Sequence, residues 1–488
     1  MHPTRREPPT SAARPHRSPR TAAVALAAVL TLTGGTLAGC APAATPATPT
    51  ASVVATPVAL PNSPLGEQAA WVIAAMNEES STLEQELGER MTPELLEAAP
   101  AAQLTAIFAQ LRAAAPWTPT AVDDGGDQAT ITITPASAEA AAAVPGLGSS
   151  GALDLQIAVD AAGTVSGLLF SPAAADRTPA TSWQELSSAV EGFAADTSMQ
   201  VTEVTDAGAD ATPLLDIGAD ESKPSGSMFK LYVLGAVADA VAAGSLTWET
   251  PLTITDDVKS LPSGELQDQP SGTTVTVREA AEKMISISDN TATDLLIAAV
   301  GPAAVERSFA DLGHHDPAEN TPLLTTRALF QLGWGDAAPR AAWEAAGSES
   351  ERRAVLDALP TGLVTVPVTD VTTPVWQTGL DWFTTGDDLV AVHLGLQQKA
   401  ATPTGAPVRE ILAMNNGLGD TFGDEWSYVA FKGGSSVGVL AGSWYLERAD
   451  GRAFVVSVQG SSDDPAALAD TATFFGQVDD AVSLLEKE

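Results

Sequence analysis

A serine and a lysine three residues apart form the most chemically informative pair in this chain. Ser227 and Lys230 stand at the start of an apolar run that ends at Gly244 and has the spacing of a buried helix. Residues three apart share one face of a helix, so the two side chains are expected side by side. A buried lysine that loses its charge can act as the base that turns a serine hydroxyl into a nucleophile. The pair is therefore a candidate for catalysis by a nucleophilic serine, to be judged with the motifs that accompany it.

Two further polar motifs accompany this pair, whose spacing is common by chance when it occurs alone. A Ser-Asp-Asn motif occupies residues 288–290, 61 residues after Ser227 (288 − 227 = 61), at the end of a helical pattern. A Lys-Gly-Gly-Ser motif at residues 432–435 ends a strand-like segment at 426–431. The family assignment depends on the presence of all three motifs in this order.

The three motifs resemble the active-site signature of class A β-lactamases and penicillin-binding proteins, in which Ser-x-x-Lys, Ser-Asp-Asn and Lys-Thr-Gly converge on one cleft. The resemblance covers roughly residues 181–488. The sequences around Ser227 and Asn290 also resemble the corresponding helices of that family. It implies an α/β sandwich of the β-lactamase/transpeptidase-like type for this part of the chain.

The resemblance also implies a role for each motif residue. Ser227 would attack a carbonyl with Lys230 as the base, and Ser288 would relay a proton to the leaving group. Asn290 would hold Lys230 and the substrate, while Lys432 would attract a substrate carboxylate and polarise Ser288. The structural alternatives are that Ser288 and Asn290 cap a helix and that Lys432 is an ordinary strand-end lysine. The substrate-binding residues that the resemblance implies are Gly434, Ser435 and Ser436.

The third motif departs from the family pattern, because Gly433 stands where the family has a hydroxyl side chain. A site that holds a carboxylate loses one donor there, so weaker β-lactam binding is expected unless Ser435 or Ser436 replaces that donor. The resemblance still implies an oxyanion hole made of the backbone N–H groups of Ser227 and Ser435.

Two more departures concern the segment between the second and third motifs. The Glu-Pro-x-x-Asn pattern of the deacylating Ω-loop has its nearest match at residues 316–320, where Asp316 or Glu319 is the candidate carboxylate and a simple loop turn is the alternative. The two motifs are also 144 residues apart (432 − 288 = 144), more than is usual in the family. The extra material, around residues 343–360 and 364–376, is expected to rebuild the cleft wall.

The N-terminus has the pattern of a bacterial lipoprotein signal. Five arginines precede an apolar stretch at residues 22–32, which is too short to span a bilayer as a stable helix. The stretch is followed by Leu-Ala-Gly-Cys at residues 37–40, which resembles a lipobox. We therefore expect a signal peptide at 1–39, lipidation of Cys40 and an Ala/Thr/Pro-rich tether at 40–64. Cys40 is the only cysteine, so no intrachain disulfide can form.

Two folded domains are expected after the tether. Residues 65–172 contain helical and alternating strand patterns, with a turn at 124–127, and predict a small α+β domain. Residues 181–488 begin with a helix and two strands, continue through a helical middle and end with strands at 426–432, 439–447 and 453–459 and a helix from Asp464. The pairing resembles the two-domain serine hydrolase of the clavulanic acid cluster and its actinobacterial lipoprotein relatives, which implies a cystatin or NTF2-like fold for the small domain.

The charge and the histidines exclude several other functions. A formal net charge of −37 argues against a nucleic-acid partner, and it means that an anionic substrate needs local cations in the cleft. The mature chain has only His314, His315 and His393 and no His-Glu-x-x-His motif, which disfavours a zinc site or a Ser-His-Asp triad. No metal or other cofactor is expected.

The resulting hypothesis is an exported serine hydrolase, anchored to the outside of the cell membrane by lipid on Cys40 and acylated at Ser227. Its expected activity is that of a weak β-lactamase or an esterase on a small-molecule substrate, which would be a β-lactam, an ester or a cell-wall peptide. A D,D-peptidase acting on cell-wall peptides is one alternative. A non-catalytic binding module of the cell envelope is another, favoured by Gly433 and disfavoured by the intact Ser227, Lys230, Ser288 and Asn290.

Overall fold

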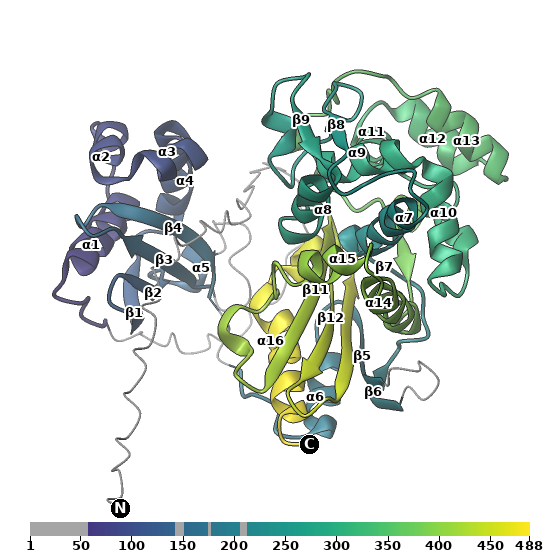
Figure 1. Ribbon diagram of the computed structural model, residues 1–488. Helices are drawn as coiled ribbons and strands as arrows, with labels where there is room; N and C mark the ends of the chain where they lie inside the picture. The colour runs from purple at the N-terminus through teal and green to yellow at the C-terminus, as the bar shows by residue number, and fades with distance from the viewer. Residues whose placement is uncertain (1–56, 142–150, 174–176, 205–211) are drawn as a thin grey trace, which may run out of the picture.

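The structure is a computed structural model that describes residues 57–141, 151–173, 177–204 and 212–488 (Figure 1). Two parts of the chain each have their own core, one before residue 173 and one after residue 180. Within the described ranges, no helix is long and apolar enough to cross a bilayer. The expected signal segment, Cys40 and most of the tether lie outside these ranges.

The small domain is an antiparallel sheet covered by helices, which confirms the expected α+β class. Its four strands pair in the order β1-β2-β3-β4, and the turn at 124–127 joins the first two. The sequence indicated two of the strands and two of the helices, and it missed the others. Leu60 already packs against this core, so contacts of the domain begin before residue 65. The elements are α1 (Pro64–Asn77), α2 (Leu83–Arg90), α3 (Pro93–Ala98), α4 (Ala101–Leu111), β1 (Thr118–Asp124), β2 (Gln128–Thr134), α5 (Ala138–Ala141), β3 (Leu153–Val159) and β4 (Val165–Pro172).

The large domain is an α/β sandwich around a five-stranded antiparallel sheet, as the resemblance implied. The strand order is β11-β12-β13-β5-β6. One face packs against α6 (Trp183–Glu191) and α16 (Thr471–Leu485). The other face packs against the helical part of the domain (Figure 1). The strands are β5 (Asp196–Val204), β6 (Thr212–Ile217), β11 (Trp426–Ser436), β12 (Val439–Arg448) and β13 (Ala453–Ser461).

The helical part carries the first two motifs and the inserted material. Helix α7 follows the first motif directly, and α8 starts at a capping box in which Thr276 and Glu279 exchange hydrogen bonds. Two short two-stranded sheets, β7 with β10 and β8 with β9, complete it. The elements are β7 (Lys223–Pro224), α7 (Lys230–Ala242), β8 (Pro251–Thr253), β9 (Thr274–Thr276), α8 (Val277–Ser286), α9 (Asn290–Val300), α10 (Pro302–Asp311), α11 (Thr326–Trp334), α12 (Ala337–Ala345), α13 (Glu349–Asp357), β10 (Phe383–Thr384), α14 (Gly386–Ala400) and α15 (Ala406–Leu412).

Two expectations about the ends of elements were wrong. The Lys-Gly-Gly-Ser motif does not end its strand, because β11 pairs with β12 through Ser436. Strand pairing across the sheet overrides the weak strand preference of two adjacent glycines. The closing helix does not start at Asp464, which instead caps a single 3-10 turn at Pro465–Leu468, and α16 begins at Thr471.

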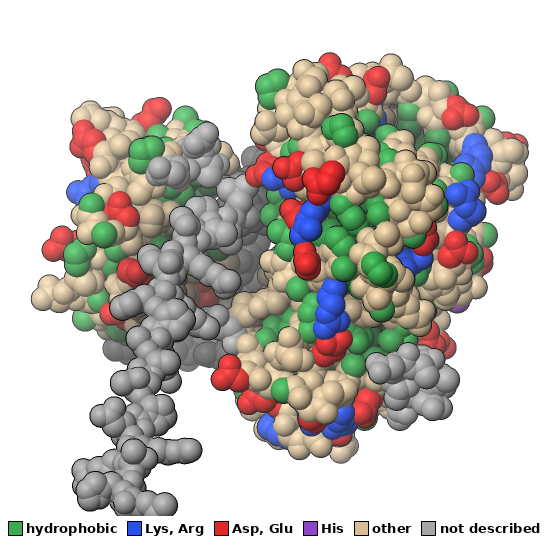
Figure 2. Space-filling view, in the orientation of Figure 1, with side chains coloured by type: hydrophobic (Ala, Val, Ile, Leu, Met, Phe, Trp, Pro, Cys, Tyr) green, Lys and Arg blue, Asp and Glu red, His purple; other side chains and the backbone are tan. Residues whose placement is uncertain are grey.

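Acidic side chains are spread over the surface of both domains. In Figure 2 they appear on both parts, mixed with fewer Lys and Arg side chains. This distribution agrees with the excess of acids in the sequence, 61 against 24 Lys and Arg. An unpaired cation in such a protein is therefore a feature that requires an explanation.

Candidate active site

The first motif forms a tight turn that leads into α7. Ser227 lies in a 3-10 turn, Gly226–Phe229, and Lys230 is the first residue of the helix that follows. Residues three apart eclipse one another in a 3-10 turn, so Ser227 and Lys230 are on the same side. Ser227 is half-buried, whereas Lys230 is completely buried. The serine is therefore accessible, and its neighbouring amine is in an apolar environment.

The Lys230 amine is held by the second motif. Its Nζ donates to the Ser288 carbonyl oxygen at 2.7 Å, to Ser288 Oγ at 3.1 Å and to Asn290 Oδ1 at 2.7 Å. Burial lowers the pKa of Lys230 to about 7, although the nearby carboxylates of Asp289 and Asp294 oppose that shift. A lysine with this pKa is neutral in a large fraction of molecules at neutral pH, so it can accept a proton.

Ser288 lies between two lysine amines. Its Oγ is 3.1 Å from Nζ of Lys230 and 3.0 Å from Nζ of Lys432, so the second and third motifs meet at this hydroxyl. Burial and the nearby Lys230 lower the pKa of Lys432 well below its ordinary value. Ser288 also has a φ of 57°, in the left-handed region that non-glycine residues seldom adopt. Such strain is characteristic of functional sites, where the surrounding structure holds it in place.

The residue between Ser288 and Asn290 fixes this strained turn. Asp289 is fully buried, and its carboxylate accepts hydrogen bonds from the N–H groups of Ala292, Glu265 and Leu266. It caps α9 and ties the start of that helix to the segment between β8 and β9. Asn290 donates to the Leu261 carbonyl, which leaves its Oδ1 turned toward Lys230. The helix cap expected as a structural alternative therefore exists, but Asp289 provides it.

The third motif lies directly against the nucleophile turn. A Cβ placed on Gly434 would be 2.0 Å from the Ser225 carbonyl oxygen and 3.0 Å from the Ser227 nitrogen. A Cβ on Gly226, whose φ is +51°, would be 2.6 Å from the Ser435 nitrogen. Both positions therefore require glycine, which has no side chain to block this approach. The two segments whose N–H groups are expected to form the oxyanion hole are thus in contact.

Asp381 connects the nucleophile turn to the third motif, and the sequence did not identify it. Its carboxylate is buried and accepts hydrogen bonds from the Gly226 N–H at 2.8 Å, the Trp382 N–H at 2.8 Å and the Ser436 hydroxyl at 2.7 Å. Burial raises the pKa of Asp381 to about 6, even though these donors favour its ionised form. Ser436 is therefore engaged by Asp381, while Ser435 is exposed.

The two candidate deacylation carboxylates form other contacts. Asp316 accepts from the Ala318 N–H and caps a single turn, as expected for the loop-turn alternative. Glu319 accepts from the Ser222 hydroxyl at 2.6 Å. The hydrogen bonds that the described residues make to these carboxylates come from outside the three motifs. The role of Asp316 or Glu319 in deacylation stays a prediction.

The adjacent histidines form a structural cluster with Asp388. His315 Nδ1 is 2.8 Å from Asp388 Oδ2. His314 Nδ1 accepts from the Asp316 N–H, so its Nε2 carries the proton and donates to the Phe383 carbonyl at 2.8 Å. Both His314 nitrogens are therefore occupied, and this donor set does not fit a metal ion.

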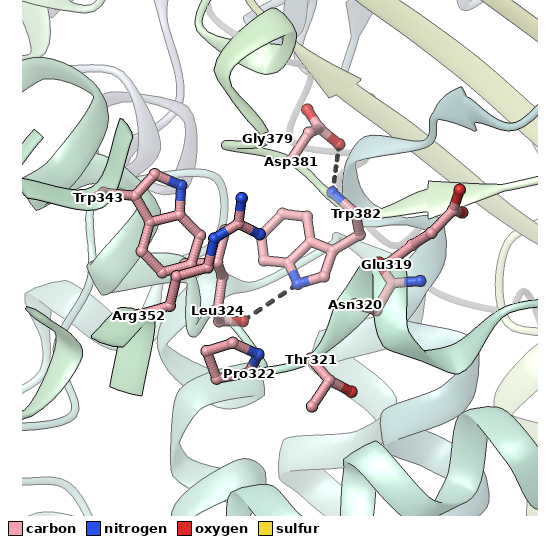
Figure 3. Close-up of a pocket in the computed structure, with 10 residues that line it drawn as sticks. All are labelled: Glu319, Asn320, Thr321, Pro322, Leu324, Trp343, Arg352, Gly379, Asp381 and Trp382. Carbon is pink, nitrogen blue, oxygen red and sulfur yellow. Dashed lines mark hydrogen bonds between the residues drawn. The ribbon is translucent and has the colours of Figure 1, made fainter. Parts of the chain in front are cut away.

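A small cavity lies next to Asp381, on the side of the inserted helices (Figure 3). Its enclosed part has room for a group about the size of one water molecule. Trp382 forms one wall, and its ring stacks on Phe229 of the nucleophile turn with centroids 3.7 Å apart. Trp343 and Arg352 come from α12 and α13, so part of the inserted material borders this cavity, whose lining includes no residue of the three motifs. The residues around the cavity are Glu319, Asn320, Thr321, Pro322, Leu324, Trp343, Arg352, Gly379, Asp381 and Trp382.

Comparisons with known proteins agree with the division into two domains. Residues 181–352 match the model of the beta-lactamase enzyme family, and residues 60–165 match a family described as ORF 12 gene product N-terminal. No curated protein matches the chain. The first of these matched segments contains Ser227, Lys230, Ser288 and Asn290, but it ends before the third motif.

The chain is also similar to solved structures of the β-lactamase and penicillin-binding classes. A PBP-A variant in an acyl-enzyme complex with penicillin G is 19% identical, with a TM-score of 0.44, over 63% of this chain and 96% of that one. A β-lactamase from Sphaerobacter thermophilus is 20% identical, with a TM-score of 0.43, over 62% of this chain and 98% of that one. A β-lactamase from Chitinophaga pinensis is 17% identical, with a TM-score of 0.42, over 63% and 98%.

Proposed function

We propose that the domain whose residues 181–352 match the beta-lactamase enzyme family works as a serine hydrolase through an acyl-enzyme at Ser227. The observation that carries this proposal is the buried amine of Lys230, which has a pKa of about 7 and stands on the same side of the turn as Ser227. A lysine with no catalytic role gains nothing from complete burial without a carboxylate partner.

In the proposed reaction the neutral Lys230 amine takes the proton of the Ser227 hydroxyl while Oγ bonds to the substrate carbonyl carbon. The carbonyl oxygen becomes negative, and the N–H groups of Ser227 and Ser435 stabilise it, an interaction typically worth about 2.7–4 kcal/mol per donor. The bond to the leaving group then breaks. The proton held by Lys230 reaches that group through Ser288, whose Oγ is within hydrogen-bond distance of both lysines. The acyl group remains on Ser227 until water removes it.

Slow deacylation and modest β-lactam affinity belong to the same proposal. Asp316 and Glu319 are hydrogen-bonded away from the three motifs, and Gly433 supplies no hydroxyl to a substrate carboxylate. We therefore expect a weak β-lactamase or an esterase, acting on a small molecule with an activated carbonyl.

The cellular setting is proposed from the sequence. Three features of the N-terminus support export and lipid anchoring at the outer side of the cell membrane. They are the arginine-rich start, the apolar residues 22–32 and the lipobox-like motif that ends at Cys40. The ORF 12 match over residues 60–165, followed by the β-lactamase match, supports the narrower proposal that the chain is related to the two-domain hydrolases of the clavulanic acid cluster and their lipoprotein relatives.

Intact-mass spectrometry tests the central step. The purified chain is mixed with a reactive cephalosporin or an activated ester, and its mass is followed with time. We expect a mass increase that maps to Ser227, is absent in Ser227→Ala and decays slowly. A mass increase of the same size in Ser227→Ala would refute the proposal, and no increase with either reagent would favour a binding module.

A further inference from the structure

Arg352 is an arginine without an acidic partner in a strongly acidic protein. Its guanidinium lies 4.9 Å from the centre of the Trp343 ring, and within the described part of the chain it makes no ion pair and no hydrogen bond. The next residue, Arg353, contacts two carboxylates, Glu306 at 2.8 Å and Glu349 at 2.7 Å. The two arginines are adjacent on α13, so neighbouring positions of one helix differ in whether the guanidinium has a carboxylate partner.

Trp343 supplies a second donor at the same cavity. Its side chain is 2% exposed, and its Nε1 is a buried N–H that has no acceptor among the described residues. A buried donor without a partner is unfavourable, so such groups usually mark a place where a ligand or water is bound. In Figure 3 the Arg352 guanidinium reaches into the space between the indole rings of Trp343 and Trp382.

The acidic residues around the cavity do not neutralise Arg352. Glu319 accepts its hydrogen bond from Ser222, and Asp381 accepts from Gly226, Trp382 and Ser436. Figure 3 shows both carboxylates turned away from the guanidinium. Arg352 and Trp343 therefore offer donors at the cavity that have no partner among the described residues, one of them cationic, and donors of this kind suit an anion.

The size of the cavity limits the part of a ligand that can enter it. Its enclosed part holds one water-sized group, which matches a single carboxylate oxygen, while the remainder of a ligand would stay at the mouth. A guanidinium presents paired N–H groups that match the two oxygens of a carboxylate. We propose that Arg352 and Trp343 form a binding subsite for a carboxylate group.

The subsite is physically connected to the nucleophile turn. Asp381 and Trp382 line the cavity, and the same two residues contact Gly226 and Phe229 on either side of Ser227. The carboxylate belongs either to the substrate, in which case the subsite rests on the proposed hydrolase function and offsets the missing hydroxyl at Gly433, or to a small free anion. Both sources present a carboxylate to Arg352 and Trp343, and the ester experiment below distinguishes them.

Acetate binding tests the subsite directly and does not depend on catalysis. The purified chain with both domains is labelled with ¹⁵N at tryptophan, and the Trp343 indole N–H signal is assigned by its loss in Trp343→Phe. We expect a saturable shift of that signal on titration with sodium acetate at constant ionic strength, kept with sodium chloride. The shift should disappear in Arg352→Gln and persist in Arg353→Gln, which removes the same charge one residue away. No saturable shift in the unmodified chain would overturn the proposal.

A pair of esters then identifies the source of the carboxylate. The two esters share a leaving group, and one carries a free carboxylate that is a methyl ester in the other. If the substrate supplies the carboxylate, Arg352→Gln lowers the second-order rate constant of acylation at least about tenfold for the acidic ester. The rate constant for the neutral ester stays unchanged. An equal response to both esters, together with the acetate shift, assigns the subsite to a free anion. If neither ester acylates Ser227, the hydrolase proposal fails while the acetate result still stands.

Discussion

The two domains bury very different kinds of side chain, although each is an antiparallel sheet covered by helices. In the described part of the small domain, the buried polar side chain is Thr92 alone. The large domain buries two lysines of its motifs and several carboxylates, including Asp289 and Asp381. Burying a charge is costly unless it is paired or made neutral. The large domain therefore accepts unfavourable burial at its motifs, as expected of a catalytic site. It also buries charges elsewhere, such as Lys223 and Asp480, where an ion pair compensates.

The two motif lysines show how this burial is tolerated. Lys230 and Lys432 both approach Ser288 Oγ, so two charged ammonium groups would repel each other strongly in a low-dielectric environment. Burial lowers the pKa of both, and Lys230 has the value of about 7. With both pKa values lowered, at least one of the two amines can be neutral, which avoids two full charges beside Ser288.

The largest expected effect comes from removing the base. Lys230→Met is close in size and apolar, so the helix should tolerate it, while acylation of Ser227 should fall about 10²–10⁴-fold. The unmodified rate should rise about tenfold from pH 6 to pH 8, because a group with a pKa of about 7 is protonated and inactive below that pH and neutral above it. This rise should be absent in the variant. Stopped-flow acylation with an activated ester measures both.

Lys223 provides a matched control for that substitution. It is also a buried lysine of the large domain, but its Nζ contacts Asp196 at 2.7 Å and Glu221 at 3.1 Å, away from the three motifs. Lys223→Met should leave the acylation rate and its pH profile essentially unchanged. If both lysine variants lost activity to the same extent, the contrast between a catalytic and a structural lysine would be wrong.

A smaller effect is expected from Asp381, which positions the nucleophile turn without contacting a reacting atom. Asp381→Ala leaves the Gly226 N–H and the Ser436 hydroxyl without their acceptor, which should cost about 1–3 kcal/mol of unfolding free energy. Displacement of Ser227 should lower acylation by up to about 10²-fold. Asp381→Asn keeps an oxygen for Gly226 and adds a donor for Ser436, so it should retain most of the activity. Thermal unfolding and acylation rates measure the two effects, and an active, fully stable Asp381→Ala would remove Asp381 from the site.

The motifs were predictable from the sequence because their residue types carry the chemistry. Ser227, Lys230 and the 288–290 motif are recognisable by spacing, and the structure joins Lys230 to Ser288 and Asn290. Asp381 was not predictable, because its role comes from the β7–β10 pairing, which places it beside Gly226, and a single aspartate in a loop has no distinguishing pattern. Arg352 and Trp343 were missed for the same reason. They are nine positions apart, and nothing in the sequence indicates that the arginine lacks an acidic partner.

Helices and strands were also predictable from the sequence only where a local pattern marks them. The alternation at 153–159 predicted β3 with its correct ends, because one face of that strand is buried. Strands β1 and β4 were missed because one is largely exposed and neither has a clear alternation. The continuation of β11 through two glycines depends on its pairing with β12, a contact that no local pattern contains.

The smallest expected effect comes from removing the small domain altogether. Its core is separate from those of the large domain, and the buried charges of the motifs lie outside it. A chain that begins at residue 177 keeps Arg177, whose guanidinium contacts Asp480 at 2.5 Å and the Gly476 carbonyl at 2.6 Å and so fastens the start of the large domain to α16. We expect this chain to fold and to acylate at Ser227 within about twofold of the full-length rate, since distant independent regions contribute additively. Acylation kinetics of the two chains with the same ester measure the difference. A loss greater than about tenfold, in a chain that still unfolds cooperatively, would mean that the small domain contributes to the site and that the contrast drawn from buried side chains is incomplete.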